Sequence, residues 1–536
     1  MKRITLVYIF LGFFFYTVKA QLSTEELPYS WEKGYDETTR QSIPMVTMPS
    51  LDMEAIRKED LKSEGDFIAA PYRFGISHEV NFSLSNSGSW EATSDGGRLW
   101  RFRIYSPDAR SLNLLYDKFW LPDGAKFFIY SEDMTQHIGA FTSQNNKGDK
   151  ENNPGFGTGL LYTNSIMLEY YEPAGISDNG IISISHVISG YRHLYSTMRG
   201  EDQSRGNHPD LLSCHKDIIC PAGSGYLQEK NAVAFMVMGN STCTGALLNT
   251  TANDNRPVFL TADHCFTTFN IPAQWVFHWN YEAPTCGGTA NTVASKSTTG
   301  AKFLAGREET DFMLLNLIEH PATNRNITIY FLGWDRTTAT ATSGVCIHHP
   351  RSSPKKISIT NKAINNYPNQ LPWTDDNGNI ISTSPENTHW RVASIDGTTE
   401  KGSSGAPLLN QNKRVIGQMH GGRIVCPTPT ADAIFYCGRF DVSWNGNISS
   451  VRLKDWLDPN GISPTTTVLN GIPCQANTNF TNQTVTTNTT FANCGNINVQ
   501  SVTVSNNAEL KIDAPGEVMI NSNFEVGFGS KLEIKK

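Results

Sequence analysis

The chain has 536 residues, with 51 Asp and Glu against 44 Lys and Arg, which gives a formal net charge of -7. This length is too great for a single core and suggests roughly three domains. The net charge is slightly negative and there is no long run of Lys and Arg, so the chain has no strong attraction to phosphate backbones. Nucleic acid is therefore not an expected partner.

The composition favours short strands over long helices. Hydrophobic residues make up 39% of the chain and charged residues 18%, and there are 43 Gly, 27 Phe and 18 Tyr. Aromatic residues favour strands, and Gly favours the turns between them. We therefore expect an all-β protein.

Residues 1–20 have the features of a signal peptide. Lys2 and Arg3 form a positive start, residues 4–15 are apolar apart from Thr5, and Val18-Lys19-Ala20 is a small-residue cleavage site. The alternative is a membrane anchor, but the apolar run is shorter than the ~20 residues that cross a bilayer. The sequence predicts export, to the medium, the cell surface or the periplasm, with no membrane span in the mature form.

The residues before the first cysteine divide into two parts. Residues 21–66 are polar, with scattered charges and prolines, and we interpret them as a leader segment. Residues 67–205 contain no Cys and show the alternating pattern of strands. We expect this part to be a β-sandwich propeptide domain, followed by an exposed, cleavable linker at 200–209. The clearest predicted strands are 99–104, 112–116, 126–130 and 166–171.

Residues 206–466 hold eight of the ten cysteines and are long enough for one two-barrel domain. In an exported protein, cysteines indicate disulfides before metal ligands. The sequence contains no C-x-x-C pair and no H-E-x-x-H motif, so no metal site is expected. Residues 467–536 return to short strands and predict a small β-module, whose role is sorting, surface attachment, glycan binding or simple stabilisation.

Three segments of the central domain contain residues suited to nucleophilic catalysis. In the first, residues 259–265, an apolar strand ends in His264, next to Cys265. A disulfide there would limit the movement of the imidazole and suit it to proton transfer, although an ordinary strand-end histidine has the same pattern. In the second, residues 309–317, Asp311 opens an apolar strand. A buried carboxylate needs a donor such as an imidazole N–H, whereas a water-facing Asp needs none.

The third segment, residues 401–408, has glycines on either side of a serine pair. This composition allows a tight turn in which the Ser404 hydroxyl is free and the amides of Gly402 and Ser404 converge on one point, an oxyanion hole. A plain turn is the alternative. The order His264, Asp311, Ser404, each beside apolar strands, predicts a catalytic triad far more strongly than any segment alone.

Together with further motifs, these segments resemble the trypsin-like serine peptidases of the chymotrypsin fold, and most of all the bacterial lysyl endopeptidases. The resemblance covers about residues 214–464. The segments that carry it are Cys243-Thr244-Gly245-Ala246-Leu247-Leu248, Thr251-Ala252-Asn253-Asp254, Thr261-Ala262-Asp263-His264-Cys265, Asp311-Phe312-Met313-Leu314-Leu315, Gly333-Trp334-Asp335-Arg336, Ile347-His348-His349-Pro350, Gly402-Ser403-Ser404-Gly405-Ala406-Pro407, Gly417-Gln418-Met419-His420-Gly421-Gly422 and Asp455-Trp456-Leu457-Asp458-Pro459.

The resemblance implies a chymotrypsin-like double β-barrel with the same triad and oxyanion hole. It also implies that Gly421 and Gly422 form a backbone edge that pairs with a substrate strand. It implies three disulfides, which are Cys243–Cys265, Cys220–Cys286 and Cys214–Cys426. For the other four cysteines the sequence suggests that Cys474 pairs with Cys494, and Cys346 with Cys437.

The residue that selects the substrate is less clearly indicated. Lysyl endopeptidases have an Asp a few residues after the equivalent of Cys426, and an ungapped count puts Phe435 at that position. Asp432 is nearby, Glu400 matches a second acidic residue of the family, and His420 matches one that stacks beside the pocket. We expect either a Lys or Arg preference or, in the absence of a carboxylate in the pocket, a hydrophobic or small residue.

The expected function is hydrolysis of protein or peptide substrates through an acyl-enzyme, with no cofactor, after release of the chain's own propeptide. The main alternative is a catalytically inactive binding or adhesion protein built on the peptidase fold, which would be favoured by loss of a triad residue. Ester or glycan hydrolysis is a third alternative, but the chain lacks the G-x-S-x-G motif and the paired carboxylates of those enzymes.

Overall fold

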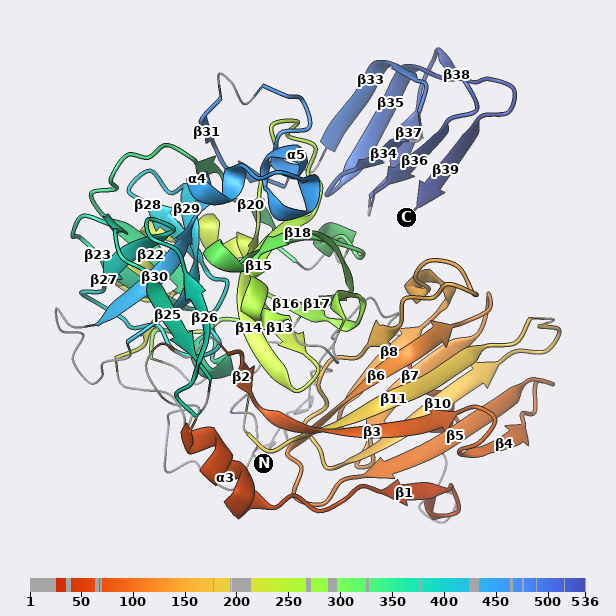
Figure 1. The fold of residues 1–536 in the computed structure, drawn as a ribbon. Coiled ribbons are helices and arrows are strands. Elements are labelled where there is room, and N and C mark those ends of the chain that lie inside the picture. Colours follow the sequence, from red (N-terminus) through yellow and green to blue (C-terminus); the bar gives the residue numbers. More distant parts are fainter. Residues whose placement is uncertain are drawn as a thin grey trace, which may run out of the picture.

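The computed structural model describes residues 26–34, 40–62, 67, 70–176, 178–192, 194, 214–266, 271–287, 296–323, 327–375, 377–423, 433–462, 466–474, 477–487, 489–514 and 516–535. The predicted signal peptide and the predicted linker at 200–209 lie outside these residues. Within them, no helix is both long enough and apolar enough to span a membrane. Strands dominate throughout, which confirms the all-β class (Figure 1).

The N-terminal part is a sandwich of a six-stranded and a four-stranded sheet. Each predicted strand falls within an observed one. In β5, Trp100, Phe102 and Ile104 point into the core between the sheets, because alternate residues of a strand face the same side. The strands of the first sheet are β1 (Met45–Thr47), β4 (Ser89–Ala92), β5 (Arg98–Tyr105), β7 (Lys126–Ser131), β8 (His137–Phe141) and β10 (Ser165–Glu172). Those of the second are β3 (Gly75–Ser83), β6 (Ser111–Trp120), β9 (Phe156–Gly157) and β11 (Ile181–Gly190). Two helices accompany this sandwich, α1 (Tyr29–Glu32) before β1 and α3 (Met53–Lys62) between β1 and β3.

The central domain begins with a sheet that closes into a barrel. Its two terminal strands, β17 and β18, are joined in the chain by Gly300 alone, so the sheet must curl until its ends meet. A short strand just before the sandwich strand β3, β2 (Tyr72–Arg73), pairs with β14. The barrel strands are β13 (Val233–Met238), β14 (Ser241–Leu247), β15 (Val258–Ala262), β16 (Val276–Trp279), β17 (Lys296–Thr299), β18 (Ala301–Arg307) and β19 (Phe312–Leu317).

A second sheet of ten strands forms the other half of the central domain. A bridge between Ile359 and Asp396 joins β23 to the segment that follows β27, which closes the sheet on itself. Its strands are β12 (Lys216–Asp217), β21 (Trp334–Asp335), β22 (Gly344–His348), β23 (Lys356–Thr360), β24 (Asn365–Tyr367), β27 (His389–Ala393), β28 (Pro407–Asn410), β29 (Val415–Gly422), β30 (Ile434–Arg439) and β31 (Val468–Leu469). Smaller elements are the pair β20 (Tyr330–Phe331) and β32 (Ile472–Pro473), the hairpin β25 (Leu371–Thr374) and β26 (Ile380–Ser384), and the helices α4 (Phe440–Trp444) and α5 (Lys454–Leu457).

The sandwich is docked on the first barrel through a shared core. Leu115 and Ile188 of the sandwich belong to the same buried cluster as Phe235 and Val276 of the barrel. Buried polar contacts accompany it, including a hydrogen bond of 3.0 Å from Gln274 Nε2 to the carbonyl of Tyr116. The two units are therefore packed as firmly as parts of one domain.

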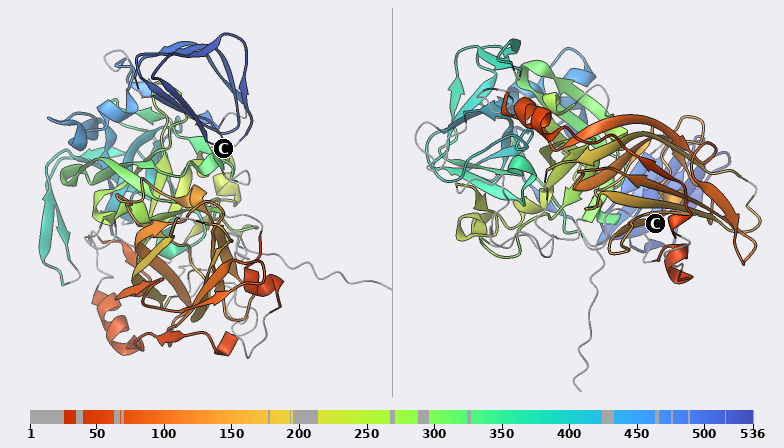
Figure 2. Two further views of the ribbon diagram at one scale, coloured as in Figure 1. Left: turned by 90° about the vertical axis from the view of Figure 1, so that its right-hand side faces the viewer. Right: turned by 90° about the horizontal axis from the view of Figure 1, so that it is seen from below.

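In Figure 2 (left), the C-terminal module lies above the central domain and the sandwich lies below it. All its strand pairs are parallel, so the chain winds in coils, and the cluster that includes Val499 and Leu510 fills the space between two sheets. The sheets contain β33 (Asn477–Val485), β35 (Asn496–Val504), β37 (Val518–Ile520) and β38 (Phe524–Val526) on one side, and β34 (Thr489–Ala492), β36 (Glu509–Asp513) and β39 (Lys531–Lys535) on the other.

Candidate active site

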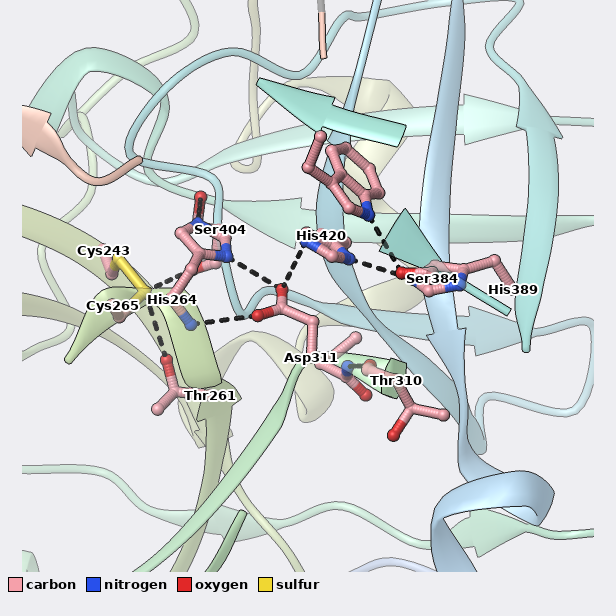
Figure 3. A network of polar contacts seen from close by, with 12 residues as sticks. Cys243, Thr261, His264, Cys265, Thr310, Asp311, Ser384, His389, Ser404 and His420 are labelled. Carbon is pink, nitrogen blue, oxygen red and sulfur yellow. Dashed lines mark hydrogen bonds and ion pairs between the residues drawn. A yellow bond between two sulfur atoms is a disulfide. The ribbon is translucent and has the colours of Figure 1, made fainter. Parts of the chain in front are cut away.

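The structure brings the three predicted residues together between the two barrels (Figure 3). His264 Nδ1 lies 2.8 Å from Asp311 Oδ2, and His264 Nε2 lies 2.8 Å from Ser404 Oγ. One imidazole therefore bridges a carboxylate and a hydroxyl. Asp311 and Ser404 are buried, and His264 is largely covered.

The local backbone explains why these side chains meet. His264 lies in a 3-10 turn, Asp263–Cys265, directly after β15. Asp311 adopts φ +55° between the turn Glu308–Thr310 and β19, the strand that pairs with β15. Its Oδ1 accepts a hydrogen bond of 2.9 Å from the His264 amide, so both carboxylate oxygens are directed at the same residue.

These bonds define the imidazole tautomer. An ionised carboxylate only accepts hydrogen bonds, so Nδ1 must carry the proton and donate it to Asp311. The lone pair of Nε2 then faces the Ser404 hydroxyl. This is the arrangement required of a general base.

The loop before Ser404 has a fixed backbone at Gly402, one of the two residues predicted to form the oxyanion hole. Gly402 has φ +90°, and a Cβ there would lie 2.8 Å from the His349 carbonyl, so only glycine suits the position. The Gly402 carbonyl accepts a hydrogen bond from Thr244 Oγ1. Within the described residues, the amides of Gly402 and Ser404 donate to no other group.

A layer of aromatic rings supports the triad from the side of the second barrel. His420 Nε2 lies 3.6 Å from Asp311 Oδ2, and the His420 ring stacks on Trp373 with centroids 3.6 Å apart. Its Nδ1 lies 3.0 Å from His389 Nε2. Burial lowers the pKa of His420 well below its ordinary value, and the nearby His389 and His264 lower it further. His420 is therefore a neutral ring packed against the carboxylate.

Within the described residues, one group could supply three ligands to a metal ion. His264, Asp311 and His420 have ligand atoms within 4.8 Å of one another. Asp311 and both ring nitrogens of His264 already take part in the hydrogen bonds that link Asp311, His264 and Ser404.

A second carboxylate next to the imidazole, that of Asp263, was not singled out by the sequence. It lies over Gly306, where a Cβ would be 2.8 Å from Asp263 Oδ1. Burial and the charge of Asp311 raise the pKa of Asp263 to about 6, opposed by His264. In the sequence, the only indication of a role for Asp263 was its position next to His264 in the motif.

We expect Asp263→Asn to stabilise the chain at pH 7.5 but not at pH 4. A carboxyl whose folded pKa is raised contributes stability below its unfolded pKa of about 4 and loses it as the pH rises through about 6. At about 1.4 kcal/mol per pKa unit, the gain is at most about 3 kcal/mol. Urea unfolding at both pH values measures it, and an equal gain at both would contradict the assigned pKa.

The cysteines agree with most of the predicted pairings. The structure contains the disulfides Cys243–Cys265 and Cys220–Cys286, and also Cys474–Cys494. Cys214 is disulfide-bonded, but Cys426 lies outside the described residues, so their pairing stays a prediction. The suggested bridge between Cys346 and Cys437 is wrong in this structure, because both are free thiols in the second-barrel core.

The residues predicted to select the substrate differ in burial and in their partners. Asp432 lies outside the described residues. Phe435, at the ungapped position of the family Asp, is buried in the second-barrel core. Glu400 is buried, and its Oε2 accepts a hydrogen bond of 3.0 Å from Arg351 Nε and lies 3.1 Å from His215 Nε2. Arg351 as a partner of Glu400 was not anticipated from the sequence.

Two β-barrels with a serine, histidine and aspartate at their junction define the structural class of the trypsin-like serine peptidases. Residues 210–436 match the family described as lysyl endopeptidase, C-terminal domain. The lysyl endopeptidase of Pseudomonas aeruginosa is 30% identical over 245 residues, which are 42% of this chain and 49% of that protein. The chain thus spans about half the length of this relative.

The comparison with solved structures gives matches of low identity and low TM-score. A Glu endopeptidase bound to MPD has 15% identity and a TM-score of 0.26, over 39% of this chain and 85% of that one. The active form of a protease from M. tuberculosis has 12% identity and a TM-score of 0.27, over 46% of this chain and 89% of that one.

Proposed function

We propose that this chain is the precursor of an exported serine endopeptidase. Ser404 is the nucleophile, His264 the general base, and Asp311 the group that orients and stabilises the imidazole. The observation that carries the proposal is the single imidazole within 2.8 Å of both a buried carboxylate and a hydroxyl.

The reaction follows from these positions. Ser404 Oγ attacks the carbonyl carbon of a peptide bond while His264 Nε2 takes its proton, and the amides of Gly402 and Ser404 bind the oxyanion. The imidazolium, stabilised by Asp311, gives the proton to the leaving amine as the C–N bond breaks. Water, deprotonated by the same imidazole, then hydrolyses the acyl-enzyme and restores the serine.

For the substrate we propose cleavage after Lys or Arg. Support comes from the similarity of residues 210–436 to lysyl endopeptidases, and from acidic residues near the predicted pocket. We favour Asp432 over Glu400 as the partner of the substrate cation, because the Glu400 carboxylate already has Arg351. A carboxylate in a dry pocket discriminates strongly for a cationic side chain.

We propose that the N-terminal sandwich is the propeptide domain and that cleavage occurs near 200–209. The arginines of this region suit a basic-specific peptidase, either this enzyme or an external activator. Because the sandwich and the first barrel share a buried cluster, the sandwich would stay bound after a single cut.

Digestion of a denatured protein mixture by the processed chain, with sequencing of the new termini, tests the function. We expect Lys or Arg before most cuts. A chain pretreated with a fluorophosphonate is the control and should give no new termini. Equal numbers of cuts in both digests would contradict the peptidase function, whereas cuts after other residues would contradict only the basic specificity.

A further inference from the structure

One aromatic residue at the start of the predicted propeptide domain, Phe67, is held on the surface beside the triad. Its amide donates a hydrogen bond of 3.3 Å to the carbonyl of Gly422, at the end of β29. Its carbonyl accepts one of 3.1 Å from the Thr374 amide, in the hairpin strand β25. The Phe67 amide is therefore bound to the end of β29 and its carbonyl to β25. An added peptide strand would use its backbone groups in the same way.

The surface that receives the Phe67 ring is aromatic and well supported. The ring centroid lies 6.3 Å from that of Trp373 and 5.8 Å from that of Tyr436. Trp373 is fully buried, and its Nε1 donates to Ser384 Oγ at 2.9 Å, which holds the indole in place. A Cβ at Gly421 would lie 2.7 Å from the indole, so the glycine allows the indole to pack against the edge strand.

This surface is continuous with the catalytic residues. Trp373 stacks on His420, and the His420 ring stacks on His264 with centroids 5.4 Å apart. A side chain bound where Phe67 lies is thus separated from the catalytic imidazole by two stacked rings.

A few residues after Phe67, the chain pairs with a strand of the first barrel that contacts the nucleophile loop. Tyr72 pairs with Thr242 of β14, and the neighbouring Thr244 amide of that strand donates to the Ser404 carbonyl at 2.9 Å. On the Phe67 side, the Met419 carbonyl of β29 accepts from the amide of Gly405 at 2.8 Å. Phe67 and Tyr72 therefore each contact a strand that hydrogen-bonds to the nucleophile loop, Phe67 at the end of β29 and Tyr72 at β14.

We propose that the surface formed by Leu371, Trp373 and Tyr436 is a substrate subsite for an aromatic side chain upstream of the cleaved bond. In the intact chain Phe67 occupies this subsite and excludes a substrate side chain from it. The inference rests on the proposed peptidase function. It adds to that function a second point of selection, which Phe67 blocks in the intact chain.

The occupancy by Phe67 is tested by the rate at which a fluorophosphonate labels Ser404 in the full-length band on a denaturing gel. We expect Phe67→Ala to be labelled about tenfold faster than the unchanged chain, and Phe67→Tyr, which keeps the ring, to be labelled slowly. Leu61→Ala, an exposed leader position, is the matched control and should be labelled slowly. Equal rates for Phe67→Ala and the unchanged chain would overturn the inhibition. No labelling of any chain, processed or intact, would instead contradict the peptidase function.

The selectivity of the subsite is tested with pairs of peptides that carry Phe or Ala at each position upstream of one cleavable bond. In the Phe67→Ala chain, we expect one position where Phe raises kcat/KM about tenfold, mainly through a lower KM. Adding Tyr436→Ala should reduce this Phe-to-Ala ratio to about one, which a general loss of structure would not do. Equal kcat/KM for both peptides at every position would overturn the subsite while leaving the peptidase function intact.

Discussion

Ser404→Ala should lower kcat on a peptide substrate by about 10⁶-fold and abolish fluorophosphonate labelling. The expected loss is this large because the imidazole then has no hydroxyl to activate, and triad members act as a unit. The His264 Nε2 that faces Ser404 Oγ at 2.8 Å would face a methyl group instead. Stopped assays on the purified processed chain measure the effect.

Ser403→Ala is the matched comparison for this variant, since Ser403 is the adjacent serine of the loop. The Ser403 hydroxyl makes hydrogen bonds with His348 Nδ1 at 2.7 Å and with the Glu400 amide at 3.2 Å. It makes no hydrogen bond with His264. Its loss should lower kcat far less and leave labelling in place. Labelling of Ser404→Ala at the unchanged rate would remove Ser404 from the mechanism.

The residues of the triad could be predicted from the sequence because each lies in a short segment whose local pattern is distinctive. An apolar strand ending in His264-Cys265 and a Gly-flanked serine pair are visible without knowledge of the fold. The sandwich strands were equally visible, since one face of each is buried and period-two alternation follows. For these features, local composition and spacing carry the necessary information.

The contacts between distant segments could not be predicted in this way. Nothing in the local sequence of Phe67 or Trp373 shows that they meet. Their contact depends on how the hairpin of β25 and β26 and the segment that contains Phe67 lie against β29. The docking of the sandwich was missed for a similar reason, since an apolar residue that faces another domain looks the same in the sequence as one that faces its own core. The pairing of Glu400 with Arg351 was likewise invisible.

The suggested disulfide between Cys346 and Cys437 was wrong because a buried cysteine does not need to form a disulfide. An even number of cysteines in an exported chain favours complete pairing, and on that basis Cys346 and Cys437 were suggested to form a bridge. Both thiols lie among apolar side chains of the second-barrel core, and burial raises both pKa values. A buried free cysteine behaves as a small apolar residue, so the core accommodates the two without a bond.

Asp311→Asn should lower kcat by about 10⁴-fold with little change in KM. Two N–H donors face the Asp311 carboxylate, the His264 amide at 2.9 Å and Nδ1–H at 2.8 Å. Asn has only one acceptor oxygen. Because the backbone N–H of His264 can only donate, the Asn oxygen should keep the hydrogen bond from that N–H, and the Asn NH₂ group should face Nδ1. The imidazole then protonates on Nε2, which donates to Ser404 and no longer accepts its proton.

Comparison of the double variant with the single ones separates this mechanism from a structural effect. Asp335→Asn, a change of the same type in β21, is the control and should retain nearly full kcat. Because the triad acts as a unit, Ser404→Ala with Asp311→Asn should be no slower than Ser404→Ala alone. A fall of less than tenfold for Asp311→Asn would contradict the role of the carboxylate. A double variant much slower than Ser404→Ala would mean that Asp311 acts independently of the imidazole.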